Sequence, residues 1–320
     1  MYIENEIILF EYFTALPSTD IDLNSKIFKE AQKLSVTILK SFIKNNYLSK
    51  IHIISNSISK TVKNNKIKYH YVENNQSLNS ILKNLAGKSL ILIAPETNKI
   101  NIKIAQKLKK KFTLLNSDFE TLKIFASKKK TFLELRKKRI PVVRVENNAN
   151  LKDVKYILKP IFGAGSENIK ITNSDTKKKE GIIVQKYYDG EVGSFIMLCK
   201  KKRMLLLSCN KHILNIKKKT ISQTGTIVGG LEQHRKMINN LAIKLKRGFP
   251  GLFGYIGVDI LMIKGQWKIL EVNTRFTSSF AGLEKAYGYN ALKKITNLYL
   301  NEKIDKKIDK LLKLKRVKFN

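Results

Sequence analysis

The sequence predicts a parallel α/β region at its amino end, followed by an α+β region that is mostly antiparallel sheet. In the first region, short apolar runs alternate with segments of helical periodicity, an order typical of strands and helices that build a parallel sheet. From residue 156 onward, strand-like runs follow one another closely, as they do in an antiparallel sheet. A hairpin near residue 260 adds acidic residues to that sheet.

The first domain is expected over residues 1–116. Its strands are predicted at 7–10, 50–55 and 89–96, and its helices at 24–46, 77–85 and 99–110. In the first helix, a stripe repeats at helical spacing and comprises Ile27, Ala31, Leu34, Ile38 and Phe42. Such a stripe predicts one face that packs against a sheet.

The rest of the chain is predicted as one or two helices and then a run of strands. The helices are expected at 118–138, 230–247 and 281–300, and the strands at 156–160, 168–172, 181–188, 194–199 and 203–209. Residues 302–320 read as a basic amphipathic helix. Its apolar side could pack on its own domain or lie on an anionic membrane, and both interpretations stay open.

The composition of the chain limits the classes of protein to which it can belong. The net charge of +37 comes mainly from Lys spread in short runs without interleaved aromatic residues, which favours a solvated surface over specific nucleic-acid binding. Phosphate-driven nucleic-acid binding remains the alternative from another class, and it should weaken steeply as salt rises. No run of eighteen apolar residues occurs, so we expect no membrane span and a cytoplasmic protein. The two cysteines and four histidines show no ligand spacing and are interpreted as structural or surface residues.

The segment 254–279 predicts a hairpin with a three-residue turn at 264–266. With that turn, Ile263 would pair with Trp267 and Asp259 would lie opposite Glu271. Asn273 lies two residues beyond Glu271 and would therefore share its face.

Two carboxylates and an amide on one face are ligands that suit a hard cation such as Mg²⁺, with Asp259, Glu271 and Asn273 as the donors. Arg275 follows directly and suits a phosphate. The alternative is an edge hairpin whose polar face is open to water.

Two further segments predict contacts to a nucleotide. The run from Lys159 to Ile171 joins two strands through a glycine-rich turn whose small residues are Gly163, Gly165 and Ser166. Small residues let backbone N–H groups approach phosphate oxygens. The strand that begins at Ile182 ends in Gln185-Lys186-Tyr187 and can offer polar groups to a purine, with Glu191 as a ribose ligand.

The order of these features resembles the ATP-grasp superfamily of carboxylate–amine ligases over residues 120–295. The resemblance rests on Lys128, then the Lys159-Pro160 glycine loop, then Gln185, and then the acidic hairpin with its E-x-N-x-R sequence. It implies a two-lobed ATP-grasp domain at 117–301, with a nucleotide-binding lobe at about 117–180 and a catalytic lobe at about 181–301. Segments such as TSSFAGL at 277–283 resemble the group that includes tyramine–glutamate ligase of methanofuran biosynthesis.

The resemblance implies a role for each of these residues. Lys128 and Lys159 would bind ATP phosphates, and Gln185, Lys186, Tyr187 and Glu191 would hold adenine and ribose. Asp259, Glu271 and Asn273 would bind Mg²⁺ or Mn²⁺, and Arg275 and Lys159 would act in catalysis. The sequence departs from the family at three positions. The family often has an Asp where Ser127 stands, and a carboxylate that binds ribose where Val192 stands. Thr274 replaces a Pro that is common after the E-x-N motif.

The function implied is amide formation between a small carboxylate and an amine through an acyl phosphate. The resemblance implies glutamate with tyramine or a related amine as the substrates. An ATP-grasp ligase for another amino acid or peptide is the alternative within the enzymes. A catalytically silent ATP-binding regulator is disfavoured because the hairpin keeps all three metal donors.

Overall fold

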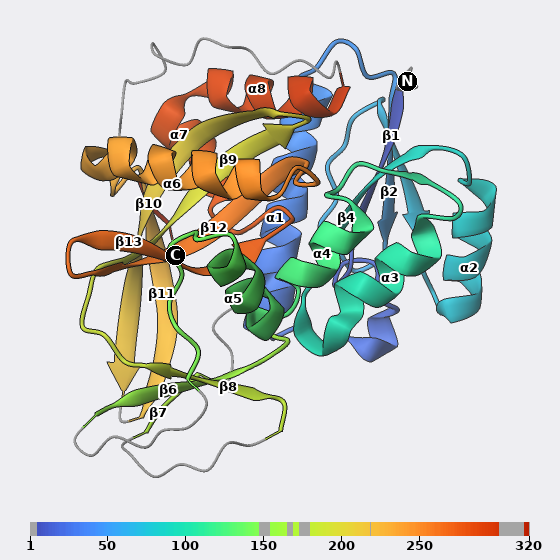
Figure 1. Cartoon of the computed structure of the whole chain (residues 1–320). Helices are drawn as coiled ribbons and strands as arrows, with labels where there is room; N and C mark the ends of the chain where they lie inside the picture. Colours follow the sequence, from blue (N-terminus) through green and yellow to red (C-terminus); the bar gives the residue numbers. More distant parts are fainter. Residues whose placement is uncertain are drawn as a thin grey trace.

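A computed structural model describes residues 5–146, 154–164, 169–172, 180–217, 219–300 and 317–319. Within these residues the chain forms two sheets, one wholly parallel and one antiparallel, as the sequence predicts. No described helix has the length and apolar character needed to cross a membrane. Figure 1 shows the parallel sheet on one side of helix α1 and the antiparallel sheet on the other.

The parallel sheet has the strand order β3-β2-β1-β4-β5 among the described residues. Its strands are β1 (Glu6–Glu11), β2 (Lys50–Ser55), β3 (Ile67–Tyr71), β4 (Ser89–Ile93) and β5 (Thr113–Leu114). Its helices are α1 (Lys26–Ile43), α2 (Asn75–Asn84), α3 (Ile100–Leu108) and α4 (Phe119–Phe125), with short 3-10 turns at Ser18–Asp20 and Thr97–Lys99. Strands β3 and β5 were not predicted, because β3 is only partly buried and β5 has only two residues.

Helix α1 begins where Ser25 accepts a hydrogen bond from the Phe28 N–H at 3.3 Å, which satisfies one free donor of the first turn. Its predicted stripe is buried from Ala31 to Phe42. Ile27 differs, because it is 36 % exposed at the end of the stripe. Each fully buried Leu, Ile or Phe side chain contributes about 1.5–3 kcal/mol to folding, so this face holds the helix in place.

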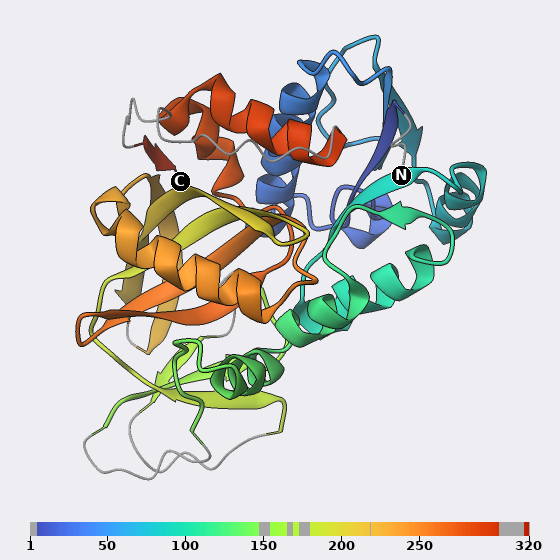
Figure 2. The ribbon, with the colours of Figure 1, turned by 45° about the horizontal axis from the view of Figure 1, so that its top comes forward.

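The antiparallel sheet runs β13-β12-β9-β10-β11-β7-β6-β8 in the described part of the chain, and β14 also pairs with β11. Its strands are β6 (Tyr156–Pro160), β7 (Lys170–Thr172), β8 (Ile182–Lys186), β9 (Val192–Lys200), β10 (Arg203–Lys217), β11 (Thr220–Val228), β12 (Gly254–Ile263), β13 (Gln266–Asn273) and β14 (Val317–Phe319). Figure 2 shows β6, β7 and β8 extending as a smaller lobe below the main sheet. Strand β8 pairs with β6 and so lies with this smaller lobe, although the expected lobe boundary at 181 precedes it.

Four helices accompany this sheet in the described residues: α5 (Lys128–Lys137), α6 (Arg235–Gly248), α7 (Phe280–Tyr287) and α8 (Tyr289–Leu300), with a 3-10 turn at Glu232–His234 before α6. The single helix predicted at 281–300 is two helices, because Gly288 takes a left-handed φ of 75° and ends α7. The predicted helix at 302–320 is wrong at 317–319, where β14 pairs with β11. The remainder of that tail lies outside the described residues.

The two regions share one hydrophobic core. Buried side chains of α1, including Ile38 and Phe42, belong to the same cluster as Phe276, Phe280 and Tyr299 of the second region. Helix α4 packs against the parallel sheet, because its Leu122 is buried in the core of that sheet. The two regions are therefore joined by apolar packing as well as by the chain.

Two histidines that are far apart in sequence meet on the parallel sheet. His52 Nδ1 lies 2.9 Å from His70 Nε2, and His52 Nε2 lies 3.2 Å from Glu6 Oε2. Burial, together with the neighbouring His52, lowers the pKa of His70 from 6.5 to about 4. The unfolded chain therefore binds a proton at this residue more readily than the folded protein does.

We expect stability to fall as the pH drops from about 6.5 towards about 4, and the His70→Gln variant to lose less stability over that range. The difference should be on the order of 2 kcal/mol, because glutamine cannot take up the proton that opposes folding. Urea unfolding of both proteins at pH 7 and pH 5 measures it. Equal losses in the two proteins would show that His70 does not carry the acid sensitivity.

Candidate active site

The acidic hairpin has a tighter turn than the sequence predicts. Lys264 and Gly265 form a two-residue turn, both with left-handed φ, of 48° and 75°. Ile263 therefore pairs with Gln266, and the predicted pairing of Ile263 with Trp267 is wrong. A β-bulge then places one extra residue, Leu270, in β13.

The bulge restores the pairing that matters for the site. Beyond it, Asp259 lies directly opposite Glu271, as predicted, and Asn273 lies opposite Gly257. Asn273 Nδ2 donates to Asp259 Oδ2 at 3.4 Å, so the amide and the two carboxylates share one face. Although β13 ends the sheet, this face lines a cavity, and Asp259 and Glu271 keep only 29 % and 22 % of their side chains exposed.

Lysines from two other elements balance the negative charge. Lys128 is the first residue of α5, and its Nζ lies 3.1 Å from Glu271 Oε2 and 2.6 Å from the Gly163 carbonyl oxygen that it donates to. Burial alone would raise the pKa of Glu271, but the Lys128 and Lys159 ammonium groups lower it to about 2. Burial lowers the pKa of Lys159 to about 8. The site thus holds Glu271 ionised beside a cation-rich wall.

Asp259 has a different environment from its neighbour. Burial raises its pKa, against a hydrogen bond from His212, and the neighbouring Glu271 raises it further. A divalent cation between the two carboxylates would remove their repulsion. The donor set fits such an ion, because two carboxylates and the Asn273 amide leave coordination positions for phosphate oxygens.

Two cavities meet at this cluster. One, of about 180 Å³, lies between the smaller lobe and the hairpin, and is called here the nucleotide cavity. The other, of about 390 Å³, lies between the antiparallel sheet and the first region, and is called the substrate cavity. Both are lined by Asp259, Glu271 and His212, so the acidic pair stands in their common wall.

The nucleotide cavity contains most of the predicted nucleotide ligands. Its lining includes Lys128, Lys159, Gly163, Gln185, Lys186 and Tyr187, with apolar walls from Val143, Ile157 and Leu261. Gln185 is buried, and its Nε2 donates to the Val143 carbonyl oxygen at 3.3 Å. Such a slot, with apolar sides and polar groups at one end, is suited to a purine.

Three predicted residues stand apart from this group. Gly165 and Ser166 lie outside the described residues. Glu191 is not among the described residues that line the nucleotide cavity, and instead forms ion pairs with Lys211 at 2.7 Å and with His234 at 3.7 Å. The turn before it requires Gly190, because a Cβ there would lie 2.2 Å from the Met262 carbonyl oxygen.

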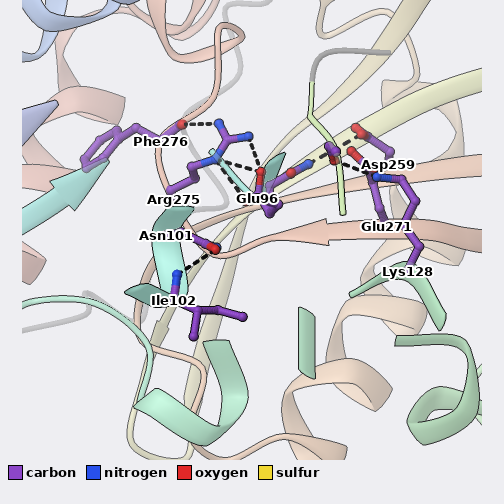
Figure 3. A network of polar contacts seen from close by, with 10 residues as sticks. Glu96, Asn101, Ile102, Lys128, Asp259, Glu271, Arg275 and Phe276 are labelled. Carbon is purple, nitrogen blue, oxygen red and sulfur yellow. Dashed lines mark hydrogen bonds and ion pairs between the residues drawn. The ribbon is translucent and has the colours of Figure 1, made fainter. Parts of the chain in front are cut away.

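Arg275 lines the substrate cavity and joins the two regions of the chain (Figure 3). Its Nη2 and Nε donate to Glu96 at 2.7 Å and 3.0 Å, a two-pronged pair of the kind that fixes a guanidinium in place. Glu96 comes 179 residues earlier in the chain, just after β4. The pair therefore positions Arg275 for a negative group in the cavity.

Sequence reasoning missed two residues of the site, His212 and Glu96. His212 Nε2 lies 3.4 Å from Asp259 Oδ1, and its Nδ1 lies 3.2 Å from Thr226 Oγ1, which orients the ring toward the carboxylate. A single histidine in a strand gives no local signal of that role. Glu96 ends the buried SLILIAPE run, and the carboxyl end of a parallel strand was the available signal.

Comparison with known proteins identifies the family. A family model described as an ATP-grasp domain matches residues 125–279. The tyramine–L-glutamate ligase of Methanocaldococcus jannaschii is 28% identical over 288 residues, which cover 87% of this chain and 84% of that protein. The same enzyme of Methanocaldococcus fervens is also 28% identical, over 87% of this chain and 89% of that protein.

Solved structures agree on the fold. A putative ATP-grasp superfamily protein from Archaeoglobus fulgidus aligns with a TM-score of 0.73 and 21% identity, over 94% of this chain and 89% of that one. An L-amino acid ligase from Bacillus licheniformis aligns with a TM-score of 0.61 and 16% identity, over 94% of this chain and 75% of that one. Residues 125–279 therefore match the ATP-grasp family, and the likeness to tyramine–L-glutamate ligases over most of the chain supports an ATP-dependent ligase.

Proposed function

We propose that this chain joins the carboxylate of one small molecule to the amine of another, with conversion of ATP to ADP and phosphate. The observation that carries the proposal is the wall shared by the two cavities. Asp259 and Glu271 face both of them, so a nucleotide's terminal phosphate and a substrate carboxylate can meet there. The likeness to tyramine–L-glutamate ligases supports glutamate as the acid and tyramine or a related amine as its partner.

The reaction proceeds in two steps. A carboxylate oxygen of the acid attacks the γ-phosphorus of ATP, ADP leaves, and an acyl phosphate forms. The amine nitrogen then attacks the acyl carbon, the carbon–oxygen bond to phosphate breaks, and the nitrogen loses a proton. Positioning and charge neutralisation are what a protein contributes to phosphoryl transfer.

The residues of the cavities divide this work. Lys128 and Lys159 bind the phosphates, and the backbone of Gly163 lies beside them. Gly165 and Ser166, which the sequence predicts as further phosphate contacts, lie outside the described residues. Asp259, Glu271 and Asn273 would hold Mg²⁺ or Mn²⁺, which would neutralise phosphate charge. Arg275, held by Glu96, steadies the acyl phosphate.

The adenine end lies in the slot beside Gln185 and the backbone of Lys186 and Tyr187. Because Glu191 pairs with Lys211 and His234, we assign it no ribose contact. We retain the expected division of the chain into a first domain at 1–116 and an ATP-grasp domain at 117–301 as part of this proposal.

The test is release of ADP and phosphate with Mg²⁺ across a panel of acids and amines. We expect one acid–amine pair to stimulate release, and glutamate with tyramine is the first pair to try. Stimulation by another amino acid or a peptide instead would assign the alternative substrates. Release of AMP would contradict the acyl phosphate, because it indicates adenylation.

A further inference from the structure

The substrate cavity contains a buried carboxylate that the proposed reaction does not use. Glu11 ends strand β1, lines this cavity and is only 4 % exposed. Its Oε2 accepts a hydrogen bond from the Thr14 N–H at 2.7 Å, and its own carbonyl oxygen accepts one from Thr14 Oγ1 at 3.2 Å. These contacts fix the turn after β1 and hold the carboxyl group in the cavity wall.

Glu11 has no cationic partner among the residues that the structure describes. The charge of Arg275 acts to lower the pKa of Glu11, but no hydrogen bond or ion pair among the described residues joins the two, and the guanidinium donates to Glu96. Burial dominates and raises the pKa of Glu11 to about 7. A buried carboxylate is costly unless a positive group pairs with it, so this wall favours a ligand that brings one.

The other acidic groups of the cavity are engaged. Glu30 lies on α1, where its half-exposed side chain is 3.6 Å from Lys26 Nζ. Asp259 and Glu271 are paired with His212 and Lys128. Among the described carboxylates that line the cavity, Glu11 is thus the buried one that lacks a positive partner.

The surroundings of Glu11 are apolar and partly aromatic. The turn after β1 contributes Tyr12, Phe13 and Leu16, and helix α1 contributes Ile27 and Leu34. Ile27 is 36 % exposed, and it lies in the wall of this cavity. A ligand with a non-polar body would cover this side chain.

We propose that Glu11 binds the primary ammonium group of a substrate, and that this apolar wall holds the non-polar part of the same molecule. The inference rests on the proposed function, which requires an amine in this cavity. Either the amine substrate or the α-amino group of an amino-acid substrate can supply the ammonium. The aromatic lining favours the amine, whose ammonium then passes one proton to the Glu11 carboxylate before the neutral nitrogen attacks the acyl carbon.

The test compares the wild type with Glu11→Gln, which keeps an acceptor for the Thr14 N–H but removes the charge. Loss of a hydrogen bond to a charged group should raise the KM of the ammonium-bearing substrate by about 10- to 100-fold, with the KM for ATP unchanged. A higher KM for tyramine assigns the site to the amine, and a higher KM for glutamate assigns it to the amino acid. Glu11→Asp should recover part of the loss, because it restores the charge.

A binding measurement separates this inference from the proposed function. The probes are tyramine and the neutral alcohol that carries a hydroxyl in place of its amine, titrated by calorimetry. The wild type should prefer tyramine, Glu11→Gln should lose that preference, and Glu6→Gln, at the opposite end of β1, should keep it. That result would support the ammonium site at Glu11 even if no acid–amine pair stimulated release of ADP. Equal KM values and equal preferences in wild type and Glu11→Gln would overturn the site while leaving the ligase in place.

Discussion

Replacing Glu271 with alanine is expected to lower ATP-dependent product formation by at least about a thousandfold. Metal stabilisation of phosphate charge is worth several kcal/mol, and each 1.36 kcal/mol corresponds to a factor of ten in rate. Glu271 faces both cavities and is held ionised by Lys128 and Lys159, and its loss would leave Asp259 as the single carboxylate of the hairpin at the metal site. ADP release with the active acid–amine pair measures the effect.

The control for this variant is Glu120→Ala, on α4, where the side chain is 75% exposed and pairs only with Lys123 among the described residues. It should retain wild-type turnover. Calorimetry of ATP with and without Mg²⁺ adds a second measurement, in which Glu271→Ala should lose the magnesium-dependent part. Turnover close to wild type in Glu271→Ala would refute the metal assignment.

Replacing Arg275 with methionine is expected to cost about 3–5 kcal/mol of stability as well as activity, because it leaves Glu96 buried without its partner. The Glu96 side chain is only 6% exposed and accepts both prongs of the guanidinium. Urea unfolding measures the first loss, and ADP release measures the second.

The double variant Glu96→Leu/Arg275→Met separates structure from catalysis. Removing both charges should restore most of the stability, since apolar side chains of similar volume often replace a buried ion pair without loss. Activity should stay lost, because the cavity still lacks the guanidinium. A double variant that regains both would mean that Arg275 serves only to hold the two regions together.

The hairpin shows how far sequence reasoning can reach. Alternating apolar residues located both strands, and the polar positions identified Asp259, Glu271 and Asn273 as one face. The turn was nevertheless one residue too long in the prediction, and the bulge at Leu270 compensated for that error. The alternation of apolar and polar residues cannot reveal a bulge, because one extra residue shifts the pairing between the strands without changing their composition.

Contacts between distant segments could not be predicted in the same way. The pairing of Glu96 with Arg275, of His212 with Asp259 and of His52 with His70 depends on which strands become neighbours. In the sequence, nothing near any one of these residues indicates which distant residue it contacts. Glu191 illustrates the converse, since its position in the motif suggested ribose while its neighbours in space are Lys211 and His234.

The common core of α1, α7 and α8 limits how this enzyme can be re-engineered. Exchanging the amino-terminal region for that of a relative, in order to import a new amine preference, would place a foreign α1 against Phe276, Phe280 and Tyr299. Poorly matched volumes there would cost stability through voids or clashes. The α1 helix of a chimaera must therefore keep the apolar residues that α1 has in this protein. Selectivity for the amine is better altered by single substitutions in the turn after β1.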